Sequence, residues 1–126
     1  DSMFCIAKLI EMLTIQERSL VSVRSELPCV IYQNLSIRCP WRVKGALMRY
    51  LVDTHPTENL SLIDGVKIYQ PYSDNWVLVL PDASEPIVNL YASSSDRYWV
   101  EESLKDYRQW VQAFILKEQE QYMAEI

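Results

Sequence analysis

The residues best suited to chemistry lie in one short segment, Leu80-Pro81-Asp82-Ala83-Ser84-Glu85-Pro86, between two apolar runs. Two carboxylates and a hydroxyl, from Asp82, Ser84 and Glu85, fall within it, and a proline bounds the polar part at each end. One interpretation is a tight hairpin connection. The other is a ligand loop that its prolines and the flanking strands hold rigid.

Other kinds of site find little support in the sequence. The two glycines, Gly45 and Gly65, are too few for a Walker loop or a dinucleotide fingerprint. The one histidine, His55, precedes Pro56 and has no neighbour that would position it as a base, so we interpret it as a solvated residue at a helix end. We expect no catalytic residue, no metal site and no cofactor in this domain.

Composition limits the classes of partner. The chain has 126 residues, 49% of them hydrophobic, which fits one globular domain. Its 12 basic residues face 17 acidic ones, for a net charge of −5, so we expect neither nucleic acid nor a membrane as a partner. No apolar run approaches the roughly 20 residues that span a bilayer. The widely spaced Cys5, Cys29 and Cys39 indicate three reduced thiols in a cytoplasmic protein.

The first part of the chain is predicted to be helical. Apolar residues recur at three- and four-residue spacing from Met3 to Leu13, with Asp1 or Ser2 as the N-cap. A short second helix is predicted over Ser19 to Glu26, before Leu27-Pro28 ends it. We assign residues 1–27 to the end of a preceding domain and its linker, and residues 28–126 to the domain that carries the loop.

Two further helices are predicted beyond this boundary. One begins at Cys39-Pro40-Trp41 and must end near His55, because Pro56 disfavours helical geometry in the residue before it. Its predicted apolar stripe is Val43, Ala46, Leu47, Tyr50 and Leu51. The last helix has Asp96 as its N-cap, and its polar tail, Lys117 to Ile126, is expected to fray.

Four strands complete the prediction. The first covers Cys29 to Ile37, and three more follow in quick succession at Val66–Tyr69, Trp76–Leu80 and Ile87–Ala92. Their close spacing and turn residues indicate an antiparallel meander. The order of elements predicts an α+β domain, with a four-stranded, mostly antiparallel sheet and helices on one face.

The strands and the loop together resemble the C-terminal domain of the α-D-phosphohexomutases, the family of phosphoglucomutase and phosphomannomutase. The similar stretches are Asp64–Ile68, Trp76–Pro86 and Val88–Ala92, and upstream Cys39-Pro40-Trp41, Lys44-Gly45 and Met48-Arg49. In that family the loop typically reads Arg-Pro-Ser-Gly-Thr-Glu-Pro and binds the phosphate of a phosphosugar. The resemblance implies a TATA-binding-protein-like fold and a phosphate loop at Asp82, Ala83, Ser84 and Glu85.

The loop departs from the family pattern at four positions. Leu80 stands where the family has arginine, so the bidentate guanidinium that would hold a phosphate is missing. Asp82 replaces serine and brings a negative charge beside the phosphate, and Ala83 replaces glycine and restricts the backbone. Ser84 replaces threonine and keeps a hydroxyl. Compensating cations would have to approach, and Lys67 and Arg97 are the candidates nearest in sequence.

Two hypotheses follow. In the first, the chain is the phosphosugar-recognition domain of a phosphohexomutase, with an altered loop, a weakly bound hexose phosphate and the preceding domains of its own polypeptide as partners. The resemblance then implies that Mg²⁺ and a phosphoserine reside in those other domains. In the second, it is a degenerate structural or interaction domain fused to a sugar-1-phosphate nucleotidyltransferase, similar to mannose-1-phosphate guanylyltransferase-like proteins.

Overall fold

The computed structural model describes residues 1–124, which form an α+β arrangement. In chain order the elements are α1 (Ser2–Ile15), α2 (Leu20–Glu26), β1 (Ile31–Arg38), α3 (Trp41–Thr54), a 3₁₀ turn (Thr57–Asn59), β2 (Leu60–Ser61), β3 (Val66–Tyr69), β4 (Trp76–Pro81), β5 (Ile87–Ser94) and α4 (Arg97–Ala124). The predicted fold class is confirmed.

The described strands make one five-stranded sheet in the order β1-β5-β4-β3-β2, with every neighbouring pair antiparallel. The four predicted strands are all present, and β3, β4 and β5 form the expected meander. The prediction of four strands is short by one, because β2 has two residues, Leu60 and Ser61, and so few residues carry no alternation to detect.

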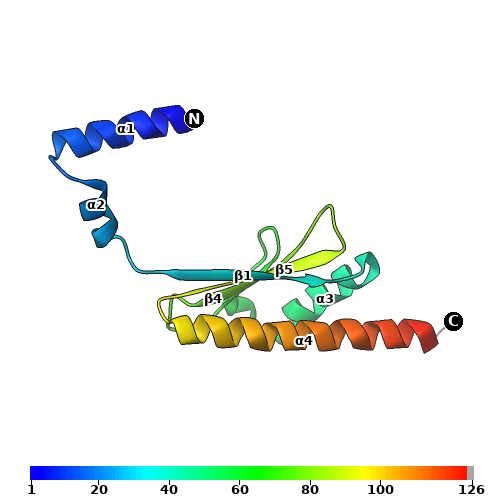
Figure 1. The fold of residues 1–126 in the computed structure, drawn as a ribbon. Coiled ribbons are helices and arrows are strands. Elements are labelled where there is room, and N and C mark those ends of the chain that lie inside the picture. The colour runs from blue at the N-terminus through cyan, green and yellow to red at the C-terminus, as the bar shows by residue number, and fades with distance from the viewer. Residues whose placement is uncertain (125–126) are drawn as a thin grey trace.

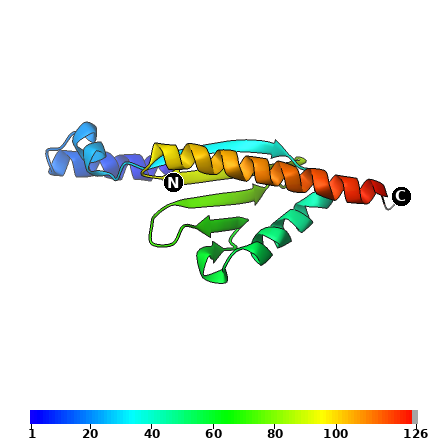
Figure 2. The same cartoon turned by 90° about the horizontal axis from the view of Figure 1, so that it is seen from below.

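Helices α3 and α4 cover one face of the sheet, and the other face is open (Figures 1 and 2). The alternate residues Val77 and Val79 of β4, and Val88, Leu90 and Ala92 of β5, are buried beneath these helices. The helices contribute Leu47, Leu51, Val100, Leu104 and Val111 to the same core. Burial of each of these valine or leucine side chains stabilises the fold by about 1.5–3 kcal/mol, so this face fixes the register of the sheet.

The buried face of α3 differs from the predicted stripe. Val43, Leu47 and Leu51 are buried as expected, but the fourth buried residue of the helix is Lys44, while Tyr50 is 40% exposed. Lys44 lies three and seven residues before Leu47 and Leu51, at the spacing that places them on one face. The prediction was wrong here because a lysine was not counted as a residue of the core.

Helix α4 is longer than predicted. It continues to Ala124, so the expectation that the tail frays from Lys117 is wrong as far as residue 124, and residues 125–126 lie outside the described part. Ile115 is buried, and the Arg42 guanidinium lies 4.0 Å from the centre of the Tyr122 ring. The Lys, Glu and Gln residues between them are good helix formers, so contacts and propensity both extend the helix.

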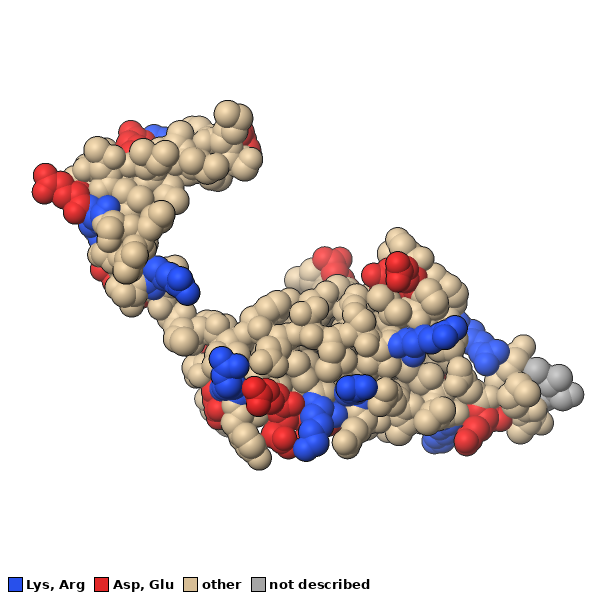
Figure 3. Space-filling view, in the orientation of Figure 1, with Lys and Arg blue, Asp and Glu red and all other residues tan. Residues whose placement is uncertain are grey.

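Helices α1 and α2 stand apart from the sheet (Figure 1) and bury none of their residues. Asp1, one of the two predicted candidates, caps α1, and Ser19 caps α2. Their surface in Figure 3 is mostly uncharged, with Met3 80% and Phe4 62% exposed. The assignment of residues 1–27 to a preceding domain stays a prediction. None of the described helices is both long and apolar enough to cross a membrane.

The three cysteines are unpaired but differ in burial, and this difference predicts their reactivity. Cys5 and Cys29 are exposed, while Cys39 is fully buried, and burial raises the pKa of its thiol although the Lys44 ammonium opposes the shift. Because the thiolate is the reactive form, we expect a thiol reagent to label Cys5 and Cys29 rapidly and Cys39 only on unfolding. Mass spectrometry of the native and denatured protein counts the labels. Rapid triple labelling of the native protein, or a disulfide, would contradict this.

Candidate functional site at the β4–β5 loop

The loop of Asp82 to Pro86 joins β4 to β5 at one end of the sheet. The Asp82 N–H donates to the Ile87 carbonyl (3.1 Å), and the Ile87 N–H donates to the Glu85 carbonyl (2.8 Å). The Cys39 N–H donates to the Pro86 carbonyl (2.8 Å), which ties the loop to the junction of β1 and α3. These bonds hold both ends of the loop against the sheet.

The Asp82 side chain folds back over its own loop. Its Oδ1 accepts hydrogen bonds from the backbone N–H groups of Ser84 (2.8 Å) and Glu85 (2.9 Å). Two successive amides therefore converge on one carboxylate oxygen, an arrangement that binds anions. In this loop the anion is part of the chain.

This arrangement changes the acidity of Asp82. The N–H groups of Ser84 and then Glu85 hold the pKa of its carboxyl below the usual range, because they bond to the charged form. Desolvation opposes this lowering of the pKa, and the Lys44 charge and the Asn89 side chain add smaller effects that lower the pKa. Asp82 is thus an anion at neutral pH, and its charge remains at the centre of the loop.

Lys44 supports the loop from beneath. Its side chain reaches out of α3 with 7% of its surface exposed, and its Nζ donates to the carbonyl oxygens of Asp82 (2.6 Å) and Glu85 (2.5 Å). The same Nζ lies 3.7 Å from the centre of the Trp41 ring. A buried ammonium is retained only where such acceptors replace its water, so Lys44 and the loop stabilise one another.

Sequence reasoning missed Lys44, and the two cations that it suggested lie elsewhere. The Nζ of Lys67 lies 3.9 Å from the centre of the Trp76 ring, at the end of β4 away from the loop. Arg97 follows the far end of β5, about 24 Å of strand from the loop, and its guanidinium lies 3.9 Å from Glu101. The burial of Lys44 could have been predicted from its helical spacing with Leu47 and Leu51.

The remaining predicted site residues lie in and beside the loop. Ala83, Ser84 and Glu85 are exposed, while Leu80 is half-buried in β4. A Cβ atom added to Gly65 would lie 2.6 Å from the Val79 carbonyl oxygen and 3.2 Å from Leu80 Cδ1. Leu80 therefore packs beside Gly65 at the start of β3, as an apolar contact of the sheet.

His55 is more enclosed than predicted. It is half-buried, with Nδ1 2.9 Å from the Leu51 carbonyl oxygen and Nε2 3.3 Å from the Tyr107 hydroxyl. The expectation of a solvated histidine was wrong, because α4 packs over the end of α3. Within residues 1–124, no group of three or more His, Cys, Asp or Glu residues is arranged to hold a metal ion.

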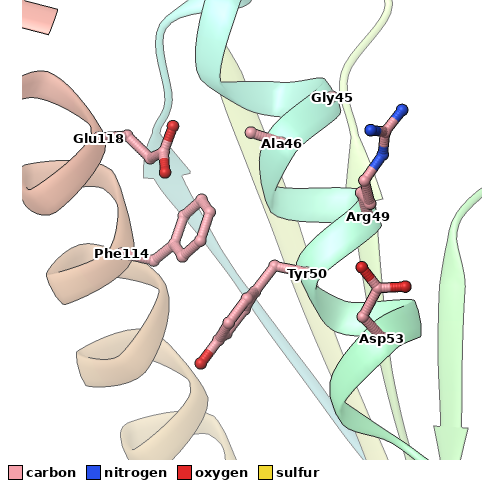
Figure 4. A pocket seen from close by; sticks show the side chains of 7 residues that line it. All are labelled: Gly45, Ala46, Arg49, Tyr50, Asp53, Phe114 and Glu118. Atoms are coloured by element: carbon pink, nitrogen blue, oxygen red, sulfur yellow. The ribbon is translucent and has the colours of Figure 1, made fainter. Parts of the chain in front are cut away.

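A separate groove lies between α3 and α4, away from the loop (Figure 4). It has a volume of about 520 Å³, and Tyr50, Phe114 and Glu118 point into the space between the helices. Arg49 and Asp53 point away from that space on the outer side of α3. The Tyr50 and Phe114 rings are in contact in a tilted arrangement, with 4.9 Å between their centres, so they pack the helices together.

Comparison with known proteins gives one partial match. No family model matches the chain. The chain is 29% identical over 93 residues to a probable phosphoglucosamine mutase of Methanopyrus kandleri. The match covers 71% of this chain but 20% of the relative, so the chain spans about a fifth of that protein's length. The similarity supports a phosphohexomutase-related region.

The Lys44 contacts predict a stability effect that an exposed lysine does not have. Lys44→Met keeps the length of the side chain but removes the donor to two carbonyl oxygens, so we expect the free energy of unfolding to fall by about 1–3 kcal/mol. Lys117→Met, on the exposed part of α4, is the matched control and should change it by less than about 0.5 kcal/mol. Equal effects in urea unfolding would contradict the role given to Lys44.

The Asp82 turn predicts a pH dependence. Because the pKa of its carboxyl is lower in the folded than in the unfolded protein, Asp82 stabilises the fold fully above the unfolded pKa, and this contribution is lost as pH falls through the folded pKa. A carboxyl-detected NMR titration should place the folded midpoint below that of the same residue in urea. An equal or higher folded midpoint would contradict the turn. Asp82→Asn should flatten the acid limb of the stability profile.

Proposed function

We propose that this chain is the C-terminal domain of a phosphohexomutase-type sugar-phosphate enzyme, and that its β4–β5 loop faces a hexose phosphate. The observation that supports this most is the convergence of the Ser84 and Glu85 N–H groups on one oxygen of an anion. The partial similarity to a phosphoglucosamine mutase, a protein named for a sugar phosphate, agrees with this proposal.

Hexose phosphate is a weak ligand of the loop in this proposal. A phosphate oxygen must displace the Asp82 carboxylate from the two amides, and the displaced carboxylate stays close by and repels it. Leu80 adds no donor, since its side chain is a hydrocarbon. The Lys44 ammonium is buried beneath the loop, and its hydrogen bonds go to backbone carbonyls. The loop contributes its shape and the Ser84 hydroxyl.

Catalysis is assigned to other domains of a longer polypeptide. The resemblance implies Mg²⁺ and a phosphoserine in the whole enzyme, and among residues 1–124 no group of three or more His, Cys, Asp or Glu side chains comes together to hold a metal ion. We therefore derive no step through the metal in this domain. The purified chain should not convert glucose or mannose phosphates.

A second candidate function has one observation in its favour. The Ser84 and Glu85 amides and the Asp82 and Glu85 carbonyls of the loop are hydrogen-bonded without a ligand, because Asp82 accepts from the amides and Lys44 donates to the carbonyls. Such a loop suits a structural domain fused to a sugar-1-phosphate nucleotidyltransferase of the mannose-1-phosphate guanylyltransferase-like kind. Assays of the longer protein for mutase and for nucleotidyl-transfer activity separate the two candidates.

The loop itself is tested by restoring the family pattern. We expect negligible binding of glucose 6-phosphate or mannose 1-phosphate to the unmodified chain at millimolar concentration. The triple variant Leu80→Arg, Asp82→Ser, Ala83→Gly should bind them weakly and in a salt-sensitive way, because the amides are freed and a guanidinium is added. Amide NMR shifts of Ser84 and Glu85 during a titration measure this.

The matched control carries Leu80→Arg, Asp82→Glu and Ala83→Gly, which gains the arginine but keeps a negative charge. It should bind less than the Asp82→Ser triple variant. Clear binding by the unmodified chain, centred on residues 82–84, would overturn the account of a self-occupied loop. Failure of the restored variant to bind would count against a phosphate-recognition loop altogether.

A further inference from the structure

Strand β1 lies at an edge of the sheet, and its backbone is free on one side. β5 is its neighbour in the sheet, and α4 lies alongside and below it (Figures 1 and 2). At eight residues β1 is as long as β5, while the opposite edge, β2, has two residues. A long regular edge strand is a ready template for another extended chain.

The hydrogen-bond pattern identifies the free backbone groups. The bond from the Cys39 N–H to the Pro86 carbonyl marks a hydrogen-bonded pair of the β1–β5 ladder. Since such pairs alternate in antiparallel strands, the odd-numbered residues of β1 bond to β5 and the even-numbered ones direct N–H and C=O outwards. The outward-facing residues are Tyr32, Asn34, Ser36 and Arg38, and all four are exposed.

A groove runs beside this edge, between β1 and α4. One hollow of about 470 Å³ includes Gln33, Leu35 and Arg108, and a second of about 360 Å³ includes Ile37 and Leu116. Gln112 of α4 lines both hollows, so the two hollows adjoin along the groove. A chain added to β1 would direct every second side chain into it.

Cations line both hollows of the groove, and apolar residues make up more of the second hollow than of the first. Lys105 and Arg108 line the first hollow and Arg38 lines the second, and Glu101 is the one acidic residue among their linings. The Lys105 Nζ lies 3.3 Å from Glu102 Oε1, so Glu102 already balances this charge. Among residues 1–124, no carboxylate oxygen lies within 4.0 Å of a nitrogen of Arg38 or Arg108. Figure 3 shows Lys and Arg side chains over α4, with acidic ones among them.

We propose that the β1–α4 groove binds an extended acidic peptide segment of a partner protein, added to the sheet as a strand beside β1. The free backbone groups of β1 supply hydrogen bonds that do not depend on sequence, and the groove supplies the selectivity. An acidic side chain faces Arg108, and an apolar side chain two or four positions along enters the hollow beside Leu116. This inference does not depend on the β4–β5 loop.

Charge argues for such a peptide over a second copy of this chain. The first hollow adjoins residues 33–35, at the middle of β1. A two-fold axis that paired β1 with β1 of another copy would therefore bring the two Arg108 guanidinium groups, which have no carboxylate partner among the described residues, towards each other. Like charges across an interface repel, whereas an acidic segment neutralises them.

A displayed library of random octapeptides, selected on the intact chain, is the test. We expect enriched sequences to place Asp or Glu two or four positions from a β-branched or aromatic residue. Arg108→Glu should weaken their binding by about tenfold and shift the selection towards Lys and Arg. Asn34→Pro should abolish binding, because it removes an outward N–H, while Asn34→Val removes the same side chain, keeps the N–H and should retain binding.

Three results would overturn the proposal. The selection could enrich no peptides, it could enrich peptides without a preference for acidic residues, or Asn34→Pro could leave peptide binding intact. A concentration-dependent dimer in sedimentation that Asn34→Pro abolishes would assign the edge to a second copy instead. Circular dichroism checks the fold of each variant. If Asn34→Pro does not fold, Arg108→Glu tests the proposal, since this residue is exposed and its change leaves the backbone of β1 unchanged. Unweakened peptide binding by Arg108→Glu would then overturn the proposal.

Discussion

The buried ammonium of Lys44 is the interaction on which the β4–β5 loop depends. It leaves the core face of α3, crosses the Trp41 ring and donates to the carbonyl oxygens of Asp82 and Glu85. Because a charge with 7% exposure has little water of its own, it requires these acceptors as much as they require a donor. The Lys44 side chain therefore positions the loop without the help of a ligand.

With its carbonyls bound from beneath, the loop presents its amides outwards, and the Asp82 carboxylate accepts from those of Ser84 and Glu85. The turn therefore has the shape of an anion-binding site, and the Asp82 carboxylate already occupies it. A serine in place of Asp82 would leave these donors to a ligand, whereas an aspartate competes with a phosphate for the same amides and repels it. The change at residue 82 thus alters the electrostatics of the loop while the strands that position it stay in place.

Much of the fold could be predicted because its signals are local. The alternation in Val66–Tyr69 gave β3 with the bounds it has, and Asp96 caps α4 as expected, its Oδ1 accepting from the Tyr98 N–H at 2.9 Å. Strand β2 was missed because pairing with β3, rather than its own pattern, makes it a strand. Lys44 and His55 were misjudged since their burial arises from the loop and from α4, which are distant in sequence. The hydrogen bonds from the Ser84 and Glu85 amides to the Asp82 side chain could have been predicted from the sequence, because aspartate commonly accepts from amides two or three residues ahead.

The central claim is that the amides of Ser84 and Glu85 are occupied by the carboxylate of Asp82, and their hydrogen exchange tests it most directly. At neutral pH both amides should exchange more slowly than the Ala83 amide, for which no acceptor is found among the described residues. Asp82→Ala should remove that protection while the amides of β4 and β5 keep theirs. Free exchange at Ser84 and Glu85 in the unmodified protein, or protection that survives Asp82→Ala, would contradict the account.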